Sequence, residues 1–122
     1  MFEISVKTHF SGAHHLREYP GECARVHGHN WEVEVMIRGP QPDALGMLID
    51  FKIVKAAIRD QVAELDHVDL NALPAFAQQN PTSENLARYL FEQLRKHLDS
   101  PQYRIYKVRV SESPGSTASY WE

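Results

Sequence analysis

Two histidines separated by one glycine, His27-Gly28-His29, are the residues of this chain whose types and spacing most directly suggest chemistry. In an extended strand, side chains two positions apart point to the same face, so the two imidazoles can share one metal ion. Gly28 between them lets a ligand or another backbone approach closely. A lone His-x-His also occurs by chance on solvated strands, so this pair needs further ligands nearby.

Other candidate groups lie close to this pair in the sequence. A catalytic zinc ion usually has three protein ligands and one open position. His14 or His15 can supply the third ligand, and the residues alone do not choose between them. Cys23 precedes the pair in an expected loop, and a thiol beside a cation has a lowered pKa. The sequence therefore predicts a zinc site with a neighbouring nucleophile or base.

Length and composition predict one ordinary globular domain spanning residues 1–122. Net charge is −3 and no Lys/Arg block stands out, so we expect no nucleic-acid or acidic-membrane partner. The single cysteine excludes an internal disulfide and fits a reducing cytoplasm. The first residues lack the pattern of a signal peptide, and no segment has the length and apolarity of a bilayer span. We therefore expect a cytoplasmic protein.

Alternating apolar residues predict two strands around the candidate metal site. The first covers residues 2–10, with His9 on its polar face, where a solvated histidine is expected. The second covers residues 27–38. Its odd positions carry His27, His29, Trp31, Val33, Val35 and Ile37. The histidine pair thus extends an apolar face, where polar groups need partners.

Two amphipathic helices are expected in the middle of the chain. Asp50 has the position of an N-cap, and apolar residues follow at helical spacing until about residues 65–67. A second helix begins after Asn80-Pro81, with Thr82 or Ser83 as its N-cap. Asp66 and His67 lie at the end of the first helix, where a charged pair can also be purely structural.

The last strand, expected over residues 104–112, places one carboxylate on an apolar face. Tyr106, Val108 and Val110 share that face, and Glu112 has the same parity. A carboxylate that continues a buried stripe is costly unless it has a partner or a role. The alternative is that the strand has already ended and Glu112 is solvated, because Pro114-Gly115 follows.

The order of these elements is strand, strand, helix, helix, strand, strand, with residues 117–121 as a short returning edge strand. This order favours an α+β fold in which an antiparallel four-stranded sheet carries both helices on one face. Exposed edges of so small a sheet invite closure by neighbouring subunits.

The chain resembles, over nearly its whole length, the 6-pyruvoyl-tetrahydropterin synthase and 6-carboxy-tetrahydropterin synthase family of zinc lyases. Each matching motif is weak alone, but their joint order and spacing are specific. The motifs are Phe10-x-x-Ala13-His14, Cys23-x-x-x-His27-Gly28-His29, Gly46-Met47-Leu48-Ile49-Asp50-Phe51, Leu65-Asp66-His67 through Leu70-Asn71, Asn80-Pro81-Thr82-Ser83-Glu84-Asn85 and Val110-Ser111-Glu112.

The resemblance implies the tunnelling fold, with trimers that close their sheets into a barrel and two trimers that stack into a hexamer. It implies that zinc is bound by His14, His27 and His29. It also implies that Cys23 is the proton acceptor, that Asp66 and His67 transfer protons with it, and that Glu112 grips the pterin ring and belongs to the catalytic set. In this family the site lies between subunits.

The implied substrate is 7,8-dihydroneopterin triphosphate, and the favoured product is 6-carboxy-5,6,7,8-tetrahydropterin for queuosine (7-deazapurine) biosynthesis. The alternatives are 6-pyruvoyl-tetrahydropterin synthesis and a pterin-binding zinc module without turnover. A module that only binds needs neither Cys23 nor the Asp66-His67 pair. Glu22, directly before Cys23, departs from the pattern, because some relatives carry a glutamate near this position and cleave the side chain instead.

Overall fold

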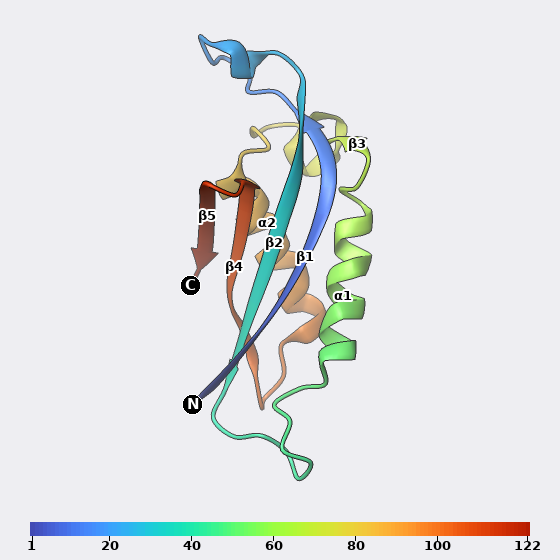
Figure 1. Ribbon diagram of the computed structural model, residues 1–122, viewed down its shortest axis with the longest axis vertical. Coiled ribbons are helices and arrows are strands. Elements are labelled where there is room, and N and C mark those ends of the chain that lie inside the picture. The colour runs from blue at the N-terminus through green and yellow to red at the C-terminus, as the bar shows by residue number, and fades with distance from the viewer.

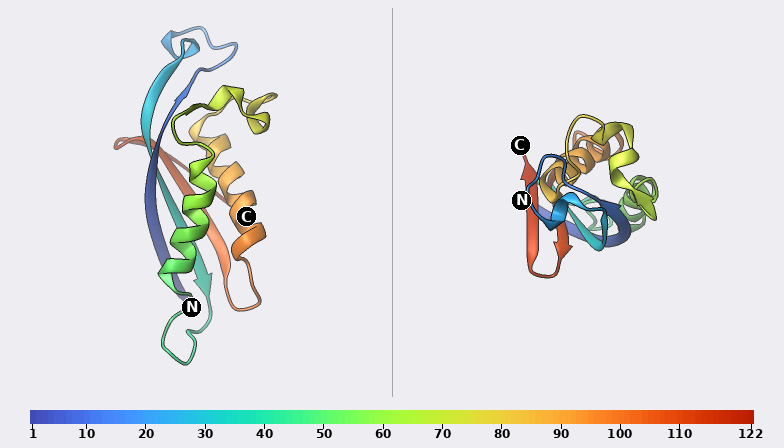
Figure 2. Two further views of the ribbon diagram at one scale, coloured as in Figure 1. Left: turned by 90° about the vertical axis from the view of Figure 1, so that its right-hand side faces the viewer. Right: turned by 90° about the horizontal axis from the view of Figure 1, so that it is seen from above.

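Five strands form one sheet in the order β3-β1-β2-β4-β5, and two helices cover one of its faces (Figure 1; Figure 2). The computed structural model describes residues 1–122. The strands are β1 (Phe2–His14), β2 (His27–Gly39), β3 (Val68–Asp69), β4 (Arg104–Ser113) and β5 (Ser116–Trp121), and the helices are α1 (Phe51–Ala63) and α2 (Ser83–Leu98). Short 3₁₀ turns are η1 (Glu22–Ala24), η2 (Leu70–Ala72) and η3 (Pro74–Phe76).

The α+β architecture and the placement of both helices on one face are confirmed, but the sheet has five strands rather than four. The additional strand, β3, is only two residues long and pairs in parallel with Gly12 and Ala13 of β1. It was missed because so short a segment shows no periodicity. The returning edge strand is confirmed as β5.

The long pair of β1 and β2 forms the centre of the sheet and runs without interruption from Phe2↔Gly39 to His14↔His27. β1 therefore extends four residues beyond the expected end at Phe10. Trp31 stacks on Phe10 with ring centroids 5.9 Å apart and donates from its indole Nε1 to the Gly12 carbonyl oxygen at 3.1 Å. These contacts keep the two strands together up to the histidines.

The two helices begin at side-chain caps that the sequence predicts. The Asp50 carboxylate accepts from the Lys52 amide at 2.9 Å, and the Thr82 hydroxyl, rather than Ser83, accepts from the Asn85 amide at 3.1 Å. Each helix turns its apolar stripe towards the inner face of the sheet, and one cluster of 22 buried residues joins both layers. No helix has the length and apolarity needed to cross a membrane.

A bulge in β4 makes one sequence prediction wrong. Ile37 pairs with Ile105 and Met36 pairs with Lys107, so Tyr106 is an extra residue in the ladder. The buried face therefore carries Ile105 with Val108, whereas the Tyr106 ring lies 3.4 Å beneath the Arg38 guanidinium, outside the core. A single inserted residue reverses the parity of the strand, which alternation alone cannot reveal.

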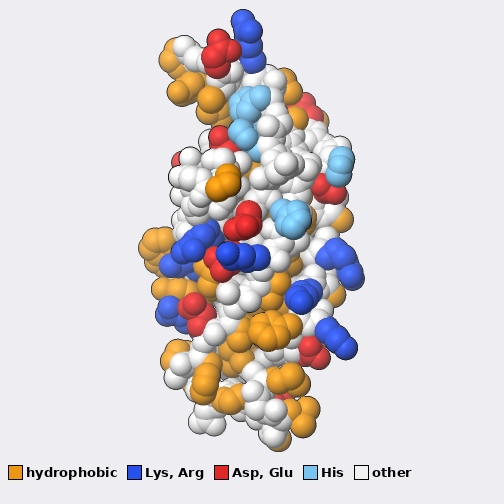
Figure 3. All heavy atoms as spheres, viewed as in Figure 1, with side chains coloured by type: hydrophobic (Ala, Val, Ile, Leu, Met, Phe, Trp, Pro, Cys, Tyr) orange, Lys and Arg blue, Asp and Glu red, His pale blue; other side chains and the backbone are white.

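The face of the sheet without helices carries charged side chains of both signs over its middle, with hydrophobic side chains among and below them (Figure 3). Cross-strand ion pairs connect its strands at distances from 2.6 to 3.9 Å, and they are Glu3–Arg38, Lys7–Glu32 and Glu34–Arg109. Exposed pairs of this kind contribute little to stability. The buried apolar layer under the helices therefore supplies most of the free energy that holds the sheet.

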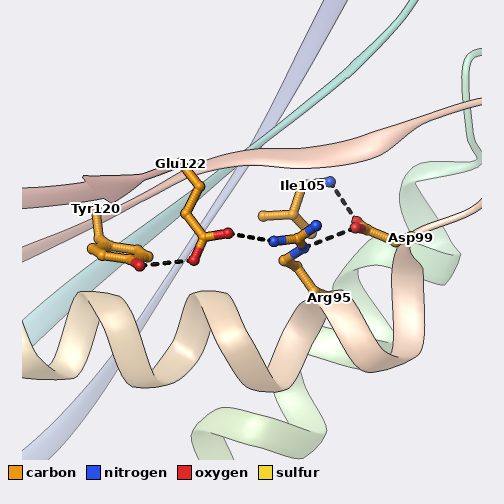
Figure 4. Close-up of polar contacts among 5 residues, drawn as sticks. All are labelled: Arg95, Asp99, Ile105, Tyr120 and Glu122. Carbon is orange, nitrogen blue, oxygen red and sulfur yellow. Dashed lines mark hydrogen bonds and ion pairs between the residues drawn. The ribbon is translucent and has the colours of Figure 1, made fainter.

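A row of polar contacts joins the C-terminal end of α2 to β4 and to the C-terminal residue Glu122 (Figure 4). Asp99 accepts from the Arg95 Nε at 3.0 Å and from the Ile105 amide at 2.8 Å. Arg95 also donates to Glu122, which accepts from the Tyr120 hydroxyl at 2.8 Å. Asp99 is thus the junction between helix and strand.

We predict that Asp99→Ala lowers the free energy of unfolding by about 1–3 kcal/mol, because the Ile105 amide and the Arg95 guanidinium lose their shared acceptor. Chemical denaturation measures this change. Asp60→Ala is the matched control, since Asp60 is exposed on α1 and makes no hydrogen bond or ion pair. Equal stability of the two variants would show that the junction contributes nothing.

Candidate metal centre

Three histidines meet where the apolar inner face of β1 and β2 ends. His14 and His27 are directly opposite each other in the strand pair, and His29 follows on the same face of β2. Their possible ligand atoms all lie within 4.8 Å of one another. His15 points elsewhere and lies beside Asn71. The cluster therefore contains His14 and not His15.

Hydrogen bonds to backbone oxygens orient two of these rings. The Nδ1 of His14 lies 2.8 Å from the Pro81 carbonyl oxygen, and the Nδ1 of His27 lies 2.7 Å from that of Arg25. A ring that donates from Nδ1 keeps a lone pair on Nε2, which is the usual arrangement of a metal-binding histidine. Both Nε2 atoms are thus available for a metal ion.

The burial of the cluster fits a metal ion. His14 is 2% exposed, and burial lowers the pKa of its imidazole, which favours the neutral form that binds metals. The Nε2 atoms of His14 and His29 are both buried without a hydrogen-bond partner. Buried polar atoms without partners are rare, and two of them within ligand distance of each other make this cluster able to hold a metal ion.

Glu112 lies at the rim of this cluster rather than free in solvent. Its Oε1 is 3.3 Å from the His29 Nε2, close enough for an ion pair. The two groups are not aligned for a hydrogen bond. The residue keeps the parity of Val108 and Val110 and lies where the β4–β5 register shifts. About a third of its side chain, 35%, remains exposed, so the carboxylate can reach a ligand.

Asp66 and His67 form a pair in the turn after α1, attached to the backbone of β1. Asp66 accepts from the Ser11 amide at 2.9 Å and lies 2.9 Å from the His67 Nδ1. The hydrogen bond from the Ser11 amide lowers the pKa of the Asp66 carboxyl below its usual range, and the contact with His67 lowers it further. His67 has a φ of 57°, a left-handed conformation that is uncommon for a non-glycine residue, and its side chain is 80% exposed.

An open pocket of about 420 Å³ has one residue of this pair and one of the clustered histidines in its lining. His67 and His29 both line it, together with Ser11 and Asn30. The Ser11 hydroxyl donates to the Asn30 side chain at 2.8 Å. Sequence reasoning did not identify these two polar residues, since nothing in their spacing distinguishes them from other strand residues.

Cys23 lies in η1, on the loop that joins the two opposed ligands His14 and His27 and projects beyond the sheet (Figure 1). Its side chain is half-buried, and the residue is not part of the group of atoms within ligand distance. The neighbouring Glu22 is exposed. The chain thus offers three imidazole ligands and keeps its only thiol outside the cluster.

The sequence is similar to known pterin synthases over most of its length. A family model described as 6-pyruvoyl tetrahydropterin synthase matches residues 3–122. The chain is 32% identical over 126 residues to the 6-carboxy-5,6,7,8-tetrahydropterin synthase of Bacillus subtilis, covering 98% of this chain and 84% of that protein. It is 36% identical over 104 residues to the 6-pyruvoyl tetrahydrobiopterin synthase of Drosophila melanogaster, covering 82% of this chain and 61% of that protein.

The structure shows the same relationship. It aligns with the Caenorhabditis elegans 6-pyruvoyl tetrahydropterin synthase at a TM-score of 0.88 and 28% identity, covering 99% of this chain and 95% of that one. The arrangement of helices and strands is therefore the tunnelling fold. With this fold, and with a family match along almost its entire length, the chain belongs to the 6-pyruvoyl tetrahydropterin synthase family.

Proposed function

We propose that the chain is a zinc-dependent 6-carboxy-5,6,7,8-tetrahydropterin synthase, a cytoplasmic lyase acting on 7,8-dihydroneopterin triphosphate in queuosine biosynthesis. The observation that carries the proposal is the cluster of His14, His27 and His29, in which two buried Nε2 atoms lack partners. The name of the Bacillus subtilis relative, which covers 98% of this chain, supports the product.

The proposed roles follow from the chemistry of each side chain. His14, His27 and His29 would hold zinc, which when bound acidifies and orients the side-chain hydroxyls of the substrate. The Cys23 thiolate takes a proton from the substrate side chain. Asp66 fixes the His67 ring through Nδ1, so the other ring nitrogen is free to donate or accept a proton.

Glu112 is proposed as the anchor for the pterin ring. The ring presents two adjacent N–H donors, and a carboxylate accepts both in a strong, directional pair. Its position 3.3 Å from the His29 Nε2 and its partial exposure support this role. A pterin ring held by this carboxylate would lie beside the three histidines.

Assembly into a hexamer, a dimer of trimers, is part of the proposal. β3 covers only Gly12 and Ala13 of β1, so most of that edge has no neighbouring strand within the chain. The outer edge of β5 is also free. Unpaired edges favour pairing with further copies of the chain, and the exposed His67 would then face a neighbouring subunit.

A second candidate is 6-pyruvoyl-tetrahydropterin synthesis, favoured by the name of the Drosophila relative at 36% identity. Incubation with 7,8-dihydroneopterin triphosphate and mass spectrometry of the product separates the two. The 6-carboxy product supports our proposal and the 6-pyruvoyl product supports the alternative. Binding of the pterin without turnover would instead indicate a non-catalytic pterin-binding module.

We predict that His27→Ala loses the bound zinc, because two imidazoles rarely hold a zinc ion that needs three protein ligands. Elemental analysis of purified protein measures the stoichiometry, with one zinc per chain expected in the wild type. His97→Ala is the matched control, since His97 is exposed near the end of α2. A full complement of zinc in His27→Ala would refute the ligand assignment.

Cys23→Ala should retain fold and zinc but lose activity by roughly 100-fold or more, the usual effect of removing a general base. Turnover and zinc content are measured on the same sample. Glu18→Gln, at an exposed position of the same loop, should remain as active as the wild type. Loss of zinc from Cys23→Ala would make the thiol a ligand and contradict the proposed mechanism.

Glu112→Gln should weaken pterin binding by about 2–4 kcal/mol, since an amide presents a donor to one of the ring N–H groups. Calorimetry with a pterin gives the affinity, and a melting curve gives the stability, which should barely change. Glu34→Gln is the control, because Glu34 pairs with Arg109 on the helix-free face. An unchanged affinity with a much lower melting temperature would make Glu112 a structural residue.

A further inference from the structure

Two asparagine side chains hold the start of the loop that carries Cys23. The pairing of β1 with β2 ends at His14, so the following backbone groups have no strand partner. Asn71 accepts from the His15 amide at 2.9 Å and donates to the His15 carbonyl oxygen at 3.1 Å. Asn80 accepts from the Arg17 amide at 2.9 Å and donates to the Arg17 carbonyl oxygen at 3.2 Å.

These contacts continue a row of backbone hydrogen bonds along β1. The Ser11 amide donates to the Asp66 carboxylate at 2.9 Å, and the Ser11 carbonyl oxygen accepts from the His67 amide at 2.6 Å. The two residues of β3 then pair with Gly12 and Ala13. Alternate residues of an extended segment present their amide and carbonyl groups to the same side. A carboxamide offers the same donor and acceptor as a peptide group, so Asn71 and Asn80 replace a neighbouring strand at His15 and Arg17.

Both asparagines are themselves fixed in place. The Asn71 amide donates to the Asp69 carboxylate at 3.1 Å, and the Asn80 carbonyl oxygen accepts from Thr82 and Asn85 at 2.9 and 2.8 Å. The guanidinium of Arg17 connects the two sites, because it donates to the Asn71 carbonyl oxygen at 3.2 Å and to that of Gln79 at 3.1 Å.

We call the contacts of Asn71 with His15 and of Asn80 with Arg17 the asparagine clamp. Leu16, between His15 and Arg17, links this clamp to Cys23. Its amide donates to the Cys23 carbonyl oxygen at 2.7 Å. The other backbone hydrogen bonds of η1, from Ala24 to Gly21 and from Arg25 to Glu22, are internal to the turn. The Leu16 hydrogen bond and the contact of the His27 Nδ1 with the Arg25 carbonyl oxygen at 2.7 Å therefore fix η1 relative to the sheet.

We propose that Asn71 and Asn80 are positioning residues for Cys23. By holding His15 and Arg17 they fix the direction of the Leu16 amide, and through it the carbonyl group and side chain of Cys23. The proposal rests on the proposed role of Cys23 as proton acceptor, and it assigns these asparagines no contact with substrate or metal.

The test uses the thiol as a reporter, because Cys23 is the only cysteine of the chain. In Asn71→Ala we expect the alkylation of Cys23 by iodoacetamide to accelerate roughly tenfold, with a matching loss of hydrogen-exchange protection at the Leu16 amide. Turnover should fall roughly tenfold while KM and zinc content stay as in the wild type, because only the reacting group is displaced.

Asn71→Asp keeps the acceptor for the His15 amide and loses the donor, so it should lie between wild type and Asn71→Ala. Asn80→Asp tests the second site in the same way. Gln78→Ala is the matched control, since the exposed Gln78 side chain makes no hydrogen bond.

The proposal is overturned if both Asn71→Asp and Asn80→Asp show the same rate of Cys23 alkylation and of Leu16 amide exchange as the wild type. This holds even if the melting temperatures of the two variants fall. A tenfold loss of kcat/KM that comes from a higher KM, or a loss of turnover that comes with lost zinc, would also overturn it. Alkylation and exchange need no turnover, so they decide whether the clamp exists even if the proposed activity is absent.

Discussion

The register of β1 against β2 is the constraint on which the candidate site depends. The same inner face that buries Phe10 and Trp31 continues into His14, His27 and His29. A slip of one residue would turn every side chain of a strand to the opposite face and remove its histidines from the cluster. Apolar burial resists such a slip, because the odd residues of β2 from Trp31 to Ile37 are fully buried. The hydrophobic layer thus determines where the three imidazoles meet.

A second constraint comes from the segment between α1 and α2, which runs beside the end of β1. Its Asp66 and His67 hold Ser11, its Pro81 carbonyl oxygen orients the His14 ring, and Asn71 and Asn80 hold the start of the Cys23 loop. Each contact satisfies a polar group that the sheet alone would leave unpaired. One connecting segment therefore orients a metal ligand, the Asp66–His67 pair and the loop, so a change in its path would affect all three together.

Much of this could be predicted from the sequence, because periodicity reports which residues share a face. The alternation of β2 correctly placed His27 and His29 on the apolar side, and the N-cap at Asp50 was correct. Continuing the alternation of β1 beyond Phe10 also puts His14, and not His15, on the apolar face. The bulge at Tyr106 could not be predicted, since one extra residue leaves the composition of the strand unchanged. The hydrogen bonds from His15 to Asn71 and from Arg17 to Asn80 join residues more than 50 positions apart, and no local pattern encodes such contacts.

The groups of the candidate site differ in exposure in a way that bears on assembly. His14 is 2% exposed, the side chain of Glu112 is 35% exposed and that of His67 is 80% exposed. A left-handed conformation at a non-glycine residue costs on the order of 1 kcal/mol or more, and the exposed His67 ring gains little packing within this chain to offset it. Strained backbone conformations of this kind cluster at active sites and ligand-binding segments. A ligand or a second subunit at the open side of the pocket would supply the missing contacts. The strained His67 and the free edge of β1 before Ser11 therefore support the same proposal of a site completed by assembly.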